Sequence, residues 1–419
     1  MAYSGSGPHT QCLEISHCLQ LVIDKALDLE STGALAQMDI LKYFDSLPIV
    51  LLVLWLEKSG FPAGLISCII RHQMIVNICI GLPHAASLPE VRARGVGGLT
   101  GSRVAGALSR IPVEDLLAKF SVSWESKGFE RRIHAGSWVD NIFFASSKPH
   151  LALSALEDAE NYLRSVWQLK IKQSSKLWMP VFANDQQYER VGWRQVDSFP
   201  VLGHLLACDG ASKPCIESTL AAAWRAFWGS VKAPGISALS SARKVQQISR
   251  TVMPVIFFRA PRWPFTVSTA ERLNRLQRKM FRIVLPVRML PGETPELFNR
   301  RAARIASQLQ HDVGPWGVLW AVRVITWAAH VLRDTKHKCW SAKILDVRSS
   351  RELSERRAER HNRPETRKQG GFLSRRWTDS VPVAIDFVDK FMCAQANGIR
   401  LYAGLGFALP KVLPRIRSC

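Results

Sequence analysis

The order of apolar segments between residues 15 and 171 constrains the fold more than any other feature of this sequence. Residues 34–40 form a short apolar run with the length of a buried strand. A helical pattern at 48–56, an apolar hairpin at 131–146, a helical pattern at 151–166 and a strand-like 169–171 follow in that order. Strand, helix, hairpin, helix and strand make up a ferredoxin-like sheet, so we predict an α+β domain of that type.

Further signals surround this order of elements. Residues 15–30 have the period of an amphipathic helix, and Gly33 follows as a stop. In the predicted hairpin, residues 133–139 and 142–144 are the arms and Asp140-Asn141 is the turn. A glycine-rich loop at 94–102 leads into a helix of small residues.

The character of the chain changes after Gly203. Three helical stretches rich in Arg, Lys and Trp follow, at 219–228, 242–257 and 270–285. A further helix at 315–332 carries three tryptophans at helical spacing, which we interpret as core residues rather than stacking platforms. We therefore predict a helical region after the sheet domain, then a charged linker and a basic tail, with boundaries at 1–205, 206–290, 291–345, 346–371 and 372–419.

The charge balance bears on the partner. Lys and Arg number 56 against 34 Asp and Glu, a net charge of +22. Such self-repulsion is tolerated most readily when the partner is a polyanion, which places nucleic acid first and an anionic membrane surface second. The nine cysteines contain no CxxC pair, and the longest apolar run, 47–56, is too short to span a bilayer. We expect an intracellular protein with reduced thiols, no signal peptide and no membrane partner.

Two acids are candidates for chemistry. Asp39 lies at the end of the buried strand, and Asp140 lies at the tip of the hairpin. If those strands are neighbours, the carboxylates converge, and a hard cation such as Mg²⁺ stabilises such a pair. Taken singly, Asp39 is better explained as a helix N-cap and Asp140-Asn141 as ordinary turn chemistry, and only the two together with their flanking segments favour a metal site.

An ordered series of segments resembles the reverse transcriptases of non-LTR (LINE-like) retrotransposons. AQMDILKYFDSLP resembles the first catalytic motif of that family, and SWVDNIFFAS resembles the second. LKIKQSSK resembles the following lysine motif, SFPVLGHLL the hairpin called the primer grip, and VMPVIFFRAPRWPF with AERLNRLQRKMFRIVLP the thumb and connection helices. The resemblance implies a ferredoxin-like palm, a helical thumb and a basic helical C-terminal region.

The resemblance also implies roles for particular residues. Asp39 and Asp140 would hold two Mg²⁺ ions (or Mn²⁺), aided by Asn141 and by the carbonyl of Ile40. Phe44 would lie under the incoming sugar and exclude a 2′-OH, and a buried core aromatic is the equal alternative for this residue. The remaining implied contacts, to the nucleotide or the primer, are Gly101, Arg103, Lys176, Leu202 and Gly203, with Phe199 beside them. For Lys176 a solvated side chain, and for the primer grip a simple strand-turn, remain open.

Three departures from the family pattern qualify the implied activity. Asn141 stands where the family usually has a second Asp, and Thr100-Gly101 stands where a Gln-Gly pair is expected. Only 38 residues precede Asp39, which leaves no room for the usual fingers strands, and no endonuclease domain is present. We expect a 5′-truncated element product or a fragment.

Three functions follow from these observations. The first is an RNA-directed DNA polymerase that uses dNTPs, a DNA primer or target and an RNA template. The second is an inactive retroelement remnant that binds RNA or DNA through its basic surface. The third is an RNA-templated RNA polymerase, against which Phe44 argues. The resemblance implies the nucleus as the location, because such elements copy themselves at chromosomal sites.

Overall fold

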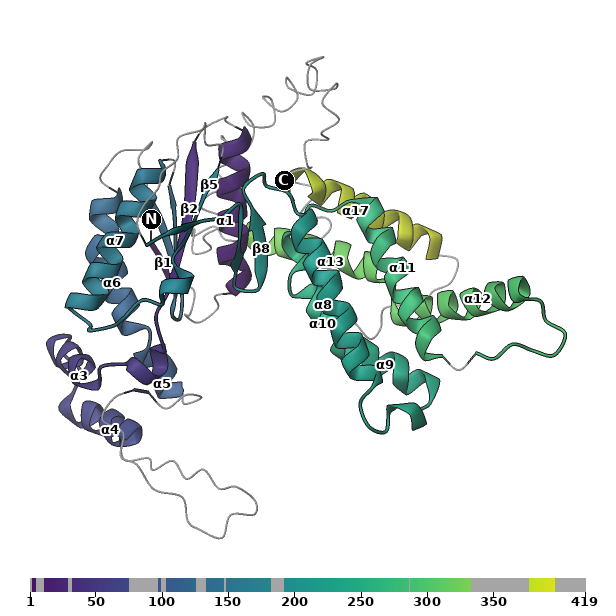
Figure 1. Cartoon of the computed structure of the whole chain (residues 1–419), viewed down its shortest axis with the longest axis horizontal. Helices are drawn as coiled ribbons and strands as arrows, with labels where there is room; N and C mark the ends of the chain where they lie inside the picture. The colour runs from purple at the N-terminus through teal and green to yellow at the C-terminus, as the bar shows by residue number, and fades with distance from the viewer. Residues whose placement is uncertain are drawn as a thin grey trace, which may run out of the picture. The chain divides into compact units, whose positions relative to one another are not determined.

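The computed structural model describes residues 2–4, 11–28, 32–74, 97–98, 103–125, 133–146, 148–181, 192–285, 287–332 and 377–395. The chain divides into two compact units, Met1–Phe199 and Pro200–Cys419. In Figure 1 the first unit runs from purple to teal and the second continues to yellow.

The first unit is built on a mixed sheet of six strands in the order β1-β3-β4-β2-β5-β6. The central strand β2 is antiparallel to both β4 and β5, and β3 is antiparallel to β4. The inner order β3-β4-β2-β5 is that of the ferredoxin-like topology, so the predicted α+β class is confirmed. The strands are β1 (Ala2–Ser4), β2 (Gly33–Asp39), β3 (Ile133–Trp138), β4 (Asn141–Ser146), β5 (Leu177–Val181) and β6 (Arg194–Gln195).

Helices cover both faces of this sheet (Figure 1). On one face α1 contacts β2, β3 and β5, and on the other α7 packs against β2 and β4 beside α6. Because β2 is buried on both faces, apolar residues occupy both faces instead of alternating with polar ones, and Gln37 within the strand is buried as well. The helices are α1 (Cys12–Asp28), α2 (Tyr43–Ser46), α3 (Ile49–Lys58), α4 (Ala63–Met74), α5 (Arg103–Leu108), α6 (Ile111–Glu125) and α7 (Pro149–Ser165), with a short 3₁₀ turn η2 (Gln173–Ser175).

Two details of the predicted sheet are wrong. Residues 169–171 form no strand, since only Ile171 makes an isolated antiparallel bridge, to Ile40, and the strand beside β2 is β5. The hairpin turn is Val139-Asp140, and Asn141 already belongs to β4, opposite Trp138. The turn shifts by one residue because Asn141 pairs in register with Asp39 on the central strand.

The second unit is mainly helical, and its boundary at Pro200 falls within β7 (Ser198–Val201), which forms a two-stranded sheet with β8 (His204–Ala207). Prolines lie in the first turn of several of its helices, where the missing N–H is tolerated. The elements are α8 (Lys213–Val231), η3 (Ile236–Ala238), α9 (Ser241–Thr251), α10 (Met253–Phe257), η4 (Ala260–Arg262), α11 (Val267–Val284), α12 (Pro295–Val313), α13 (Trp316–Leu332) and α17 (Trp377–Gln395).

Helix α13 is the centre of the core of this second unit, in contact with α11, η4 and α17. Its Trp316, Trp320 and Trp327 are buried, which confirms that these tryptophans are core residues. The predicted basic tail, 372–419, contains α17, whose Trp377 is buried and donates from Nε1 to the Pro261 carbonyl at 2.8 Å. That part of the tail is therefore a packed helix, because its apolar residues recur on one face. The predicted linker, 346–371, lies outside the described residues.

None of the described helices is both long and apolar enough to cross a membrane.

Candidate active site

The two predicted acids meet at one end of the central sheet. Asp39 is the last residue of β2, and Asp140 lies in the turn between β3 and β4. Asn141 is directly opposite Asp39 in the antiparallel pairing, so all three residues lie at the same end of neighbouring strands. The main-chain N–H of Ile40 donates to the Asp140 carbonyl at 3.1 Å, which holds the turn against the end of β2.

The environment of Asp39 disfavours its negative charge. Burial, then the charge and the hydrogen-bonding contact of Asp140, raise the pKa of Asp39 from 3.8 to about 6, against the opposing charge of Lys172 and the Ile40 N–H. The Oδ1 atom of Asp39 is buried and has no hydrogen-bond partner within the described structure. A desolvated carboxylate oxygen beside a second acid is a site at which a cation would relieve an electrostatic cost.

Asn141 contacts the acid pair as a hydrogen-bond donor. Its Nδ2 lies 3.0 Å from Oδ1 of Asp140, so the amide orients that carboxylate. The neighbouring Val139 has φ 56°, a left-handed conformation that is rare for a β-branched residue. With positive φ at the first turn position only, the loop has the pattern of a type II′ turn, which normally places Gly there. The turn that presents Asp140 is therefore strained.

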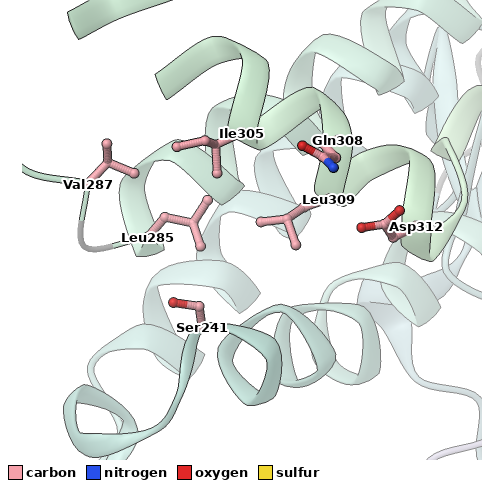
Figure 2. Close-up of a pocket in the computed structure, with 7 residues that line it drawn as sticks. All are labelled: Ser241, Leu285, Val287, Ile305, Gln308, Leu309 and Asp312. Atoms are coloured by element: carbon pink, nitrogen blue, oxygen red, sulfur yellow. The ribbon is translucent and has the colours of Figure 1, made fainter. Parts of the chain in front are cut away.

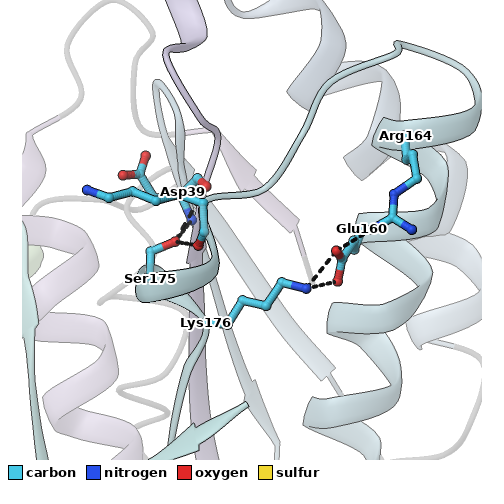
Figure 3. Close-up of polar contacts among 6 residues, drawn as sticks. Asp39, Glu160, Arg164, Ser175 and Lys176 are labelled. Carbon is cyan, nitrogen blue, oxygen red and sulfur yellow. Dashed lines mark hydrogen bonds and ion pairs between the residues drawn. The ribbon is translucent and has the colours of Figure 1, made fainter. Parts of the chain in front are cut away.

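The segment after α7 clamps the end of β2. The main-chain N–H of Lys172 donates to the Asp39 carbonyl at 2.9 Å, and that of Leu41 donates to the Lys170 carbonyl at 2.8 Å. The N–H of Asp39 donates to Oγ of Ser175 at 2.9 Å, as Figure 3 shows. Lys172 and Ser175 were not among the predicted site residues. The signal for Lys172 was present, since the predicted lysine motif contains three lysines, Lys170, Lys172 and Lys176.

Lys176, the lysine predicted to face a triphosphate, points to the interior instead (Figure 3). Its Nζ lies 2.6 Å from both carboxylate oxygens of Glu160 on α7, and it lies over the ring of Trp193, 5.3 Å from the centroid. Both side chains of the ion pair are 10% exposed or less, and Arg164 adds a second cation to Glu160. In this structure Lys176 is a buried anchor, and the lysine whose charge acts on Asp39 is Lys172.

Phe44 lies on the short helix α2, which follows Asp39 in the sequence. It is half-buried against the core, with its ring centroid 6.1 Å from that of Tyr43. Part of the glycine-rich segment packs on it: Gly98 donates its N–H to the Phe44 carbonyl, and a Cβ at Gly97 would lie 2.8 Å from the Asp45 carbonyl oxygen. The close approach explains a glycine at 97, whose φ is +95°. Of the remaining predictions here, Gly101 lies outside the described residues, as does the side chain of Arg103 at the start of α5.

Leu202 and Gly203 form the turn of the β7–β8 hairpin. Both have positive φ, 49° and 84°, the signature of a type I′ hairpin turn. The buried Arg262 ties this hairpin to η4, with Nε 3.0 Å from Nδ1 of His204 and a terminal nitrogen 2.7 Å from the Leu205 carbonyl. The predicted hairpin is therefore present, and hydrogen bonds from the buried Arg262 fix its strand β8.

The acid pair offers a limited set of ligands. Within the described residues no group of three or more His, Cys, Asp and Glu is placed to hold a metal. Two carboxylates nevertheless fit Mg²⁺, which keeps several waters and is commonly bound by one or two carboxylates plus substrate phosphates. The unpartnered Oδ1 of Asp39 supports that fit.

A pocket of about 390 Å³ lies elsewhere, between α9, α11 and α12 of the second unit (Figure 2). None of the predicted site residues lines it. Its lining residues are Ser241, Leu285, Val287, Ile305, Gln308, Leu309 and Asp312.

No protein-family model matches the chain, and no curated protein matches its sequence. Among solved structures, a Candida tropicalis telomerase in complex with a TWJ fragment of telomeric RNA aligns with TM-score 0.37 and 11% identity, over 80% of this chain and 51% of that one. The apo telomerase of the same organism aligns with TM-score 0.36 and 10% identity, over 78% and 56%. A form truncated from its C-terminal domain aligns with TM-score 0.35 and 13% identity, over 45% and 37%.

The chain thus spans between 37% and 56% of the length of these telomerase chains.

Proposed function

We propose that the protein is an RNA-directed DNA polymerase of the non-LTR retrotransposon type, which adds deoxynucleotides to a DNA primer on an RNA template and acts in the nucleus. The observation that carries the proposal is the convergence of Asp39 and Asp140, with a buried carboxylate oxygen that has no hydrogen-bond partner in the described structure. The ordered series of sequence motifs around these two acids supports the same chemistry.

Each residue at the site has a part in this proposal. Asp39 and Asp140 would hold Mg²⁺, with the carbonyl of Ile40 beside them, and Asn141 would keep the Asp140 carboxylate oriented. The ions, when bound, supply positive charge that stabilises both the attacking and the leaving oxygen of an in-line displacement at phosphorus. Lys172, exposed and acting electrostatically on Asp39, would meet the phosphates of the incoming nucleotide.

Two further elements would select and support the substrates. Phe44, half-buried after the acid pair, would close the space that a 2′-OH needs and so favour deoxynucleotides. The turn at Leu202-Gly203 would support the primer end.

The test is primer extension on an RNA template with Mg²⁺ or Mn²⁺, comparing the wild type with Asp39→Asn and Asp140→Asn. Loss of a metal ligand removes several kcal/mol of transition-state stabilisation, so we expect extension to fall by about 1,000-fold or more. Asp197→Asn is the matched control, because it removes an exposed acid of the same unit. Equal extension by the wild type and Asp39→Asn would contradict the proposal.

The alternative is a catalytically inactive remnant that binds RNA or DNA, and the amide at 141 favours it, because a neutral residue stands where the family has an acid. A folded wild type that binds RNA in a steeply salt-dependent way but extends no primer would establish this alternative.

The variant Phe44→Ala distinguishes RNA-templated RNA synthesis from RNA-templated DNA synthesis. If that variant accepts ribonucleotides that the wild type rejects, the deoxynucleotide assignment holds.

A further inference from the structure

Side chains of helices α8 and α11 of the second unit meet at two points. Arg272 donates two hydrogen bonds to the carboxylate of Glu217, at 2.7 and 2.8 Å. Seven residues further along both helices, Nζ of Lys279 lies over Trp224, 5.6 Å from the ring centroid. Seven residues are two helical turns, so the two contacts lie on one side of each helix and the helices run in the same direction.

An aromatic cluster on α8 includes Trp224. Phe227 is fully buried and meets the ring of Trp224 edge-on, with centroids 5.4 Å apart. Trp224 in turn stacks with Trp228, with centroids 6.3 Å apart and planes inclined by 22°. Trp228 is 43% exposed, unlike the buried tryptophans of α13. An aromatic ring held in place from behind and open to solvent in front is a preformed stacking surface.

Five exposed cations lie on the same two helices as Trp228. They comprise two residues of α8 and three of α11, namely Arg225, Lys232, Arg275, Lys279 and Arg282. None of the five forms an ion pair within the described residues, and the one hydrogen bond from Arg282 goes to the neutral Oδ1 of Asn299, at 2.9 Å. These charges therefore remain available to an anionic partner.

We propose that the face of α8 and α11 that carries these residues binds single-stranded nucleic acid, with a base stacked on Trp228 and the phosphates held by the cations of both helices. The cations match a phosphate backbone. The open aromatic ring selects single strands, because duplex bases are already stacked on each other and do not offer their faces. The site is independent of the acid pair and does not depend on polymerase activity.

Fluorescence anisotropy with the full chain in EDTA tests this site apart from catalysis. The probes are a labelled, unstructured oligo(U) of about 12 nucleotides, within the site sizes of single-strand binders, and a labelled RNA hairpin duplex. We expect Trp228→Ala to weaken oligo(U) binding by roughly 5- to 150-fold, the range for one stacked base, and to change duplex binding far less. Trp228→Phe retains an aromatic plane and should recover most of the affinity. Leu297→Ala is the matched control, since it removes an apolar side chain that is 53% exposed on α12.

The salt dependence tests the cations. Arg225→Ala and Lys232→Ala should each lower the slope of log K against log salt by about 0.7, the value for one phosphate contact on a single strand. Arg304→Ala, which removes an exposed charge on α12, should leave the slope unchanged.

Several outcomes would overturn the proposal. Trp228→Ala could lose the same affinity for oligo(U) and for the duplex, or lose affinity for neither. The wild type could also bind the duplex more tightly than oligo(U). A Trp228→Ala variant that loses binding to anionic phosphatidylserine vesicles, while keeping its affinity for oligo(U), would assign the face to a membrane surface. Thermal unfolding midpoints for each variant separate a folding defect from a binding defect.

Discussion

Two ion pairs, one in each unit, show two opposite uses of charge. In the first unit Lys176 and Glu160 are joined at 2.6 Å with side chains only 8% and 10% exposed. In the second unit Arg272 and Glu217 are joined at 2.7 Å, but their side chains are 43% and 46% exposed. The geometry is nearly the same, and the surroundings differ. In the interior a charge must be matched by the fold itself, whereas on the surface it remains available to a partner.

Glu160→Gln should have the largest effect on stability. It leaves the Lys176 ammonium buried without a carboxylate, so we expect the free energy of unfolding to fall by about 3 kcal/mol or more, as measured by urea denaturation. Adding Lys176→Met should recover much of the loss, because the double variant buries no unpaired charge. A cost below about 1 kcal/mol for Glu160→Gln would show that this pair behaves like a surface pair.

The pH dependence of stability should report the acid pair. The pKa of Asp39 rises from 3.8 to about 6 on folding, so between these values the folded protein holds a proton that the unfolded chain has lost. Asp39 therefore contributes a loss of stability as the pH rises from about 4 to 6, and that loss is complete above pH 6. Allowing for solvent screening, we expect about 1–2 kcal/mol.

The comparison of wild type with Asp39→Asn isolates this contribution from those of other acids. The variant should be the more stable of the two at pH 7 and the difference should vanish near pH 4, in thermal or urea unfolding without divalent metal. A wild type that is more stable than the variant at pH 7 would show that the Asp39 carboxylate is stabilised by contacts other than those with Lys172 and the Ile40 N–H.

The two hairpin turns also contrast. In the second unit Gly203 has φ +84°, and a Cβ there would lie 3.3 Å from a ring carbon of Phe258, so Gly203→Val should cost about 1–2 kcal/mol. In the first unit Val139→Gly should change stability by less than about 0.5 kcal/mol, because relief of the strained φ offsets lost packing. Both are measured by chemical denaturation. A large loss in Val139→Gly would mean that packing, not backbone conformation, dominates at that turn.

The exposed ion pair should give the smallest effect. Glu217→Gln removes the partner of Arg272, and we expect a change of at most about 0.5 kcal/mol that disappears at high salt. Since Arg272 lies beside the proposed nucleic-acid face, the same variant should bind oligo(U) slightly more tightly. Unchanged destabilisation at low and high salt would point to packing instead of charge.

Part of the fold was predictable because the signals are local. Strand β2, the hairpin and α7 each follow from periodicity within a single segment. The sequence does not predict strand β5, because Pro180 stands within it and proline is unusual inside a strand. It predicts a strand at 169–171 instead. A short apolar run does not reveal which strand it pairs with. Here residues 169–171 pair with the end of β2 at a single residue, through the bridge between Ile40 and Ile171.

The candidate site divides in the same way. The convergence of Asp39 and Asp140 was predictable, because the element order places β2 beside the hairpin. The identity of the lysine near the two acids was not predictable. The 3₁₀ turn η2 lies between Lys172 and Lys176, so the two side chains point in different directions. The anchoring of Lys176 depends on Glu160, sixteen residues away on α7.

Three features can be read from the residues alone: the α+β order of the first unit, the basic character of the chain and the two candidate acids, Asp39 and Asp140. Those features depend on residue type and on periodicity along one segment. The tertiary structure alone decided that Lys172 is the lysine whose charge acts on Asp39, that α17 packs against α13, and that Trp228 is exposed while Trp320 is buried. The reason is physical: the exposure and partners of a side chain depend on elements far away in the sequence, and two tryptophans on similar helices look alike until their neighbours are in place.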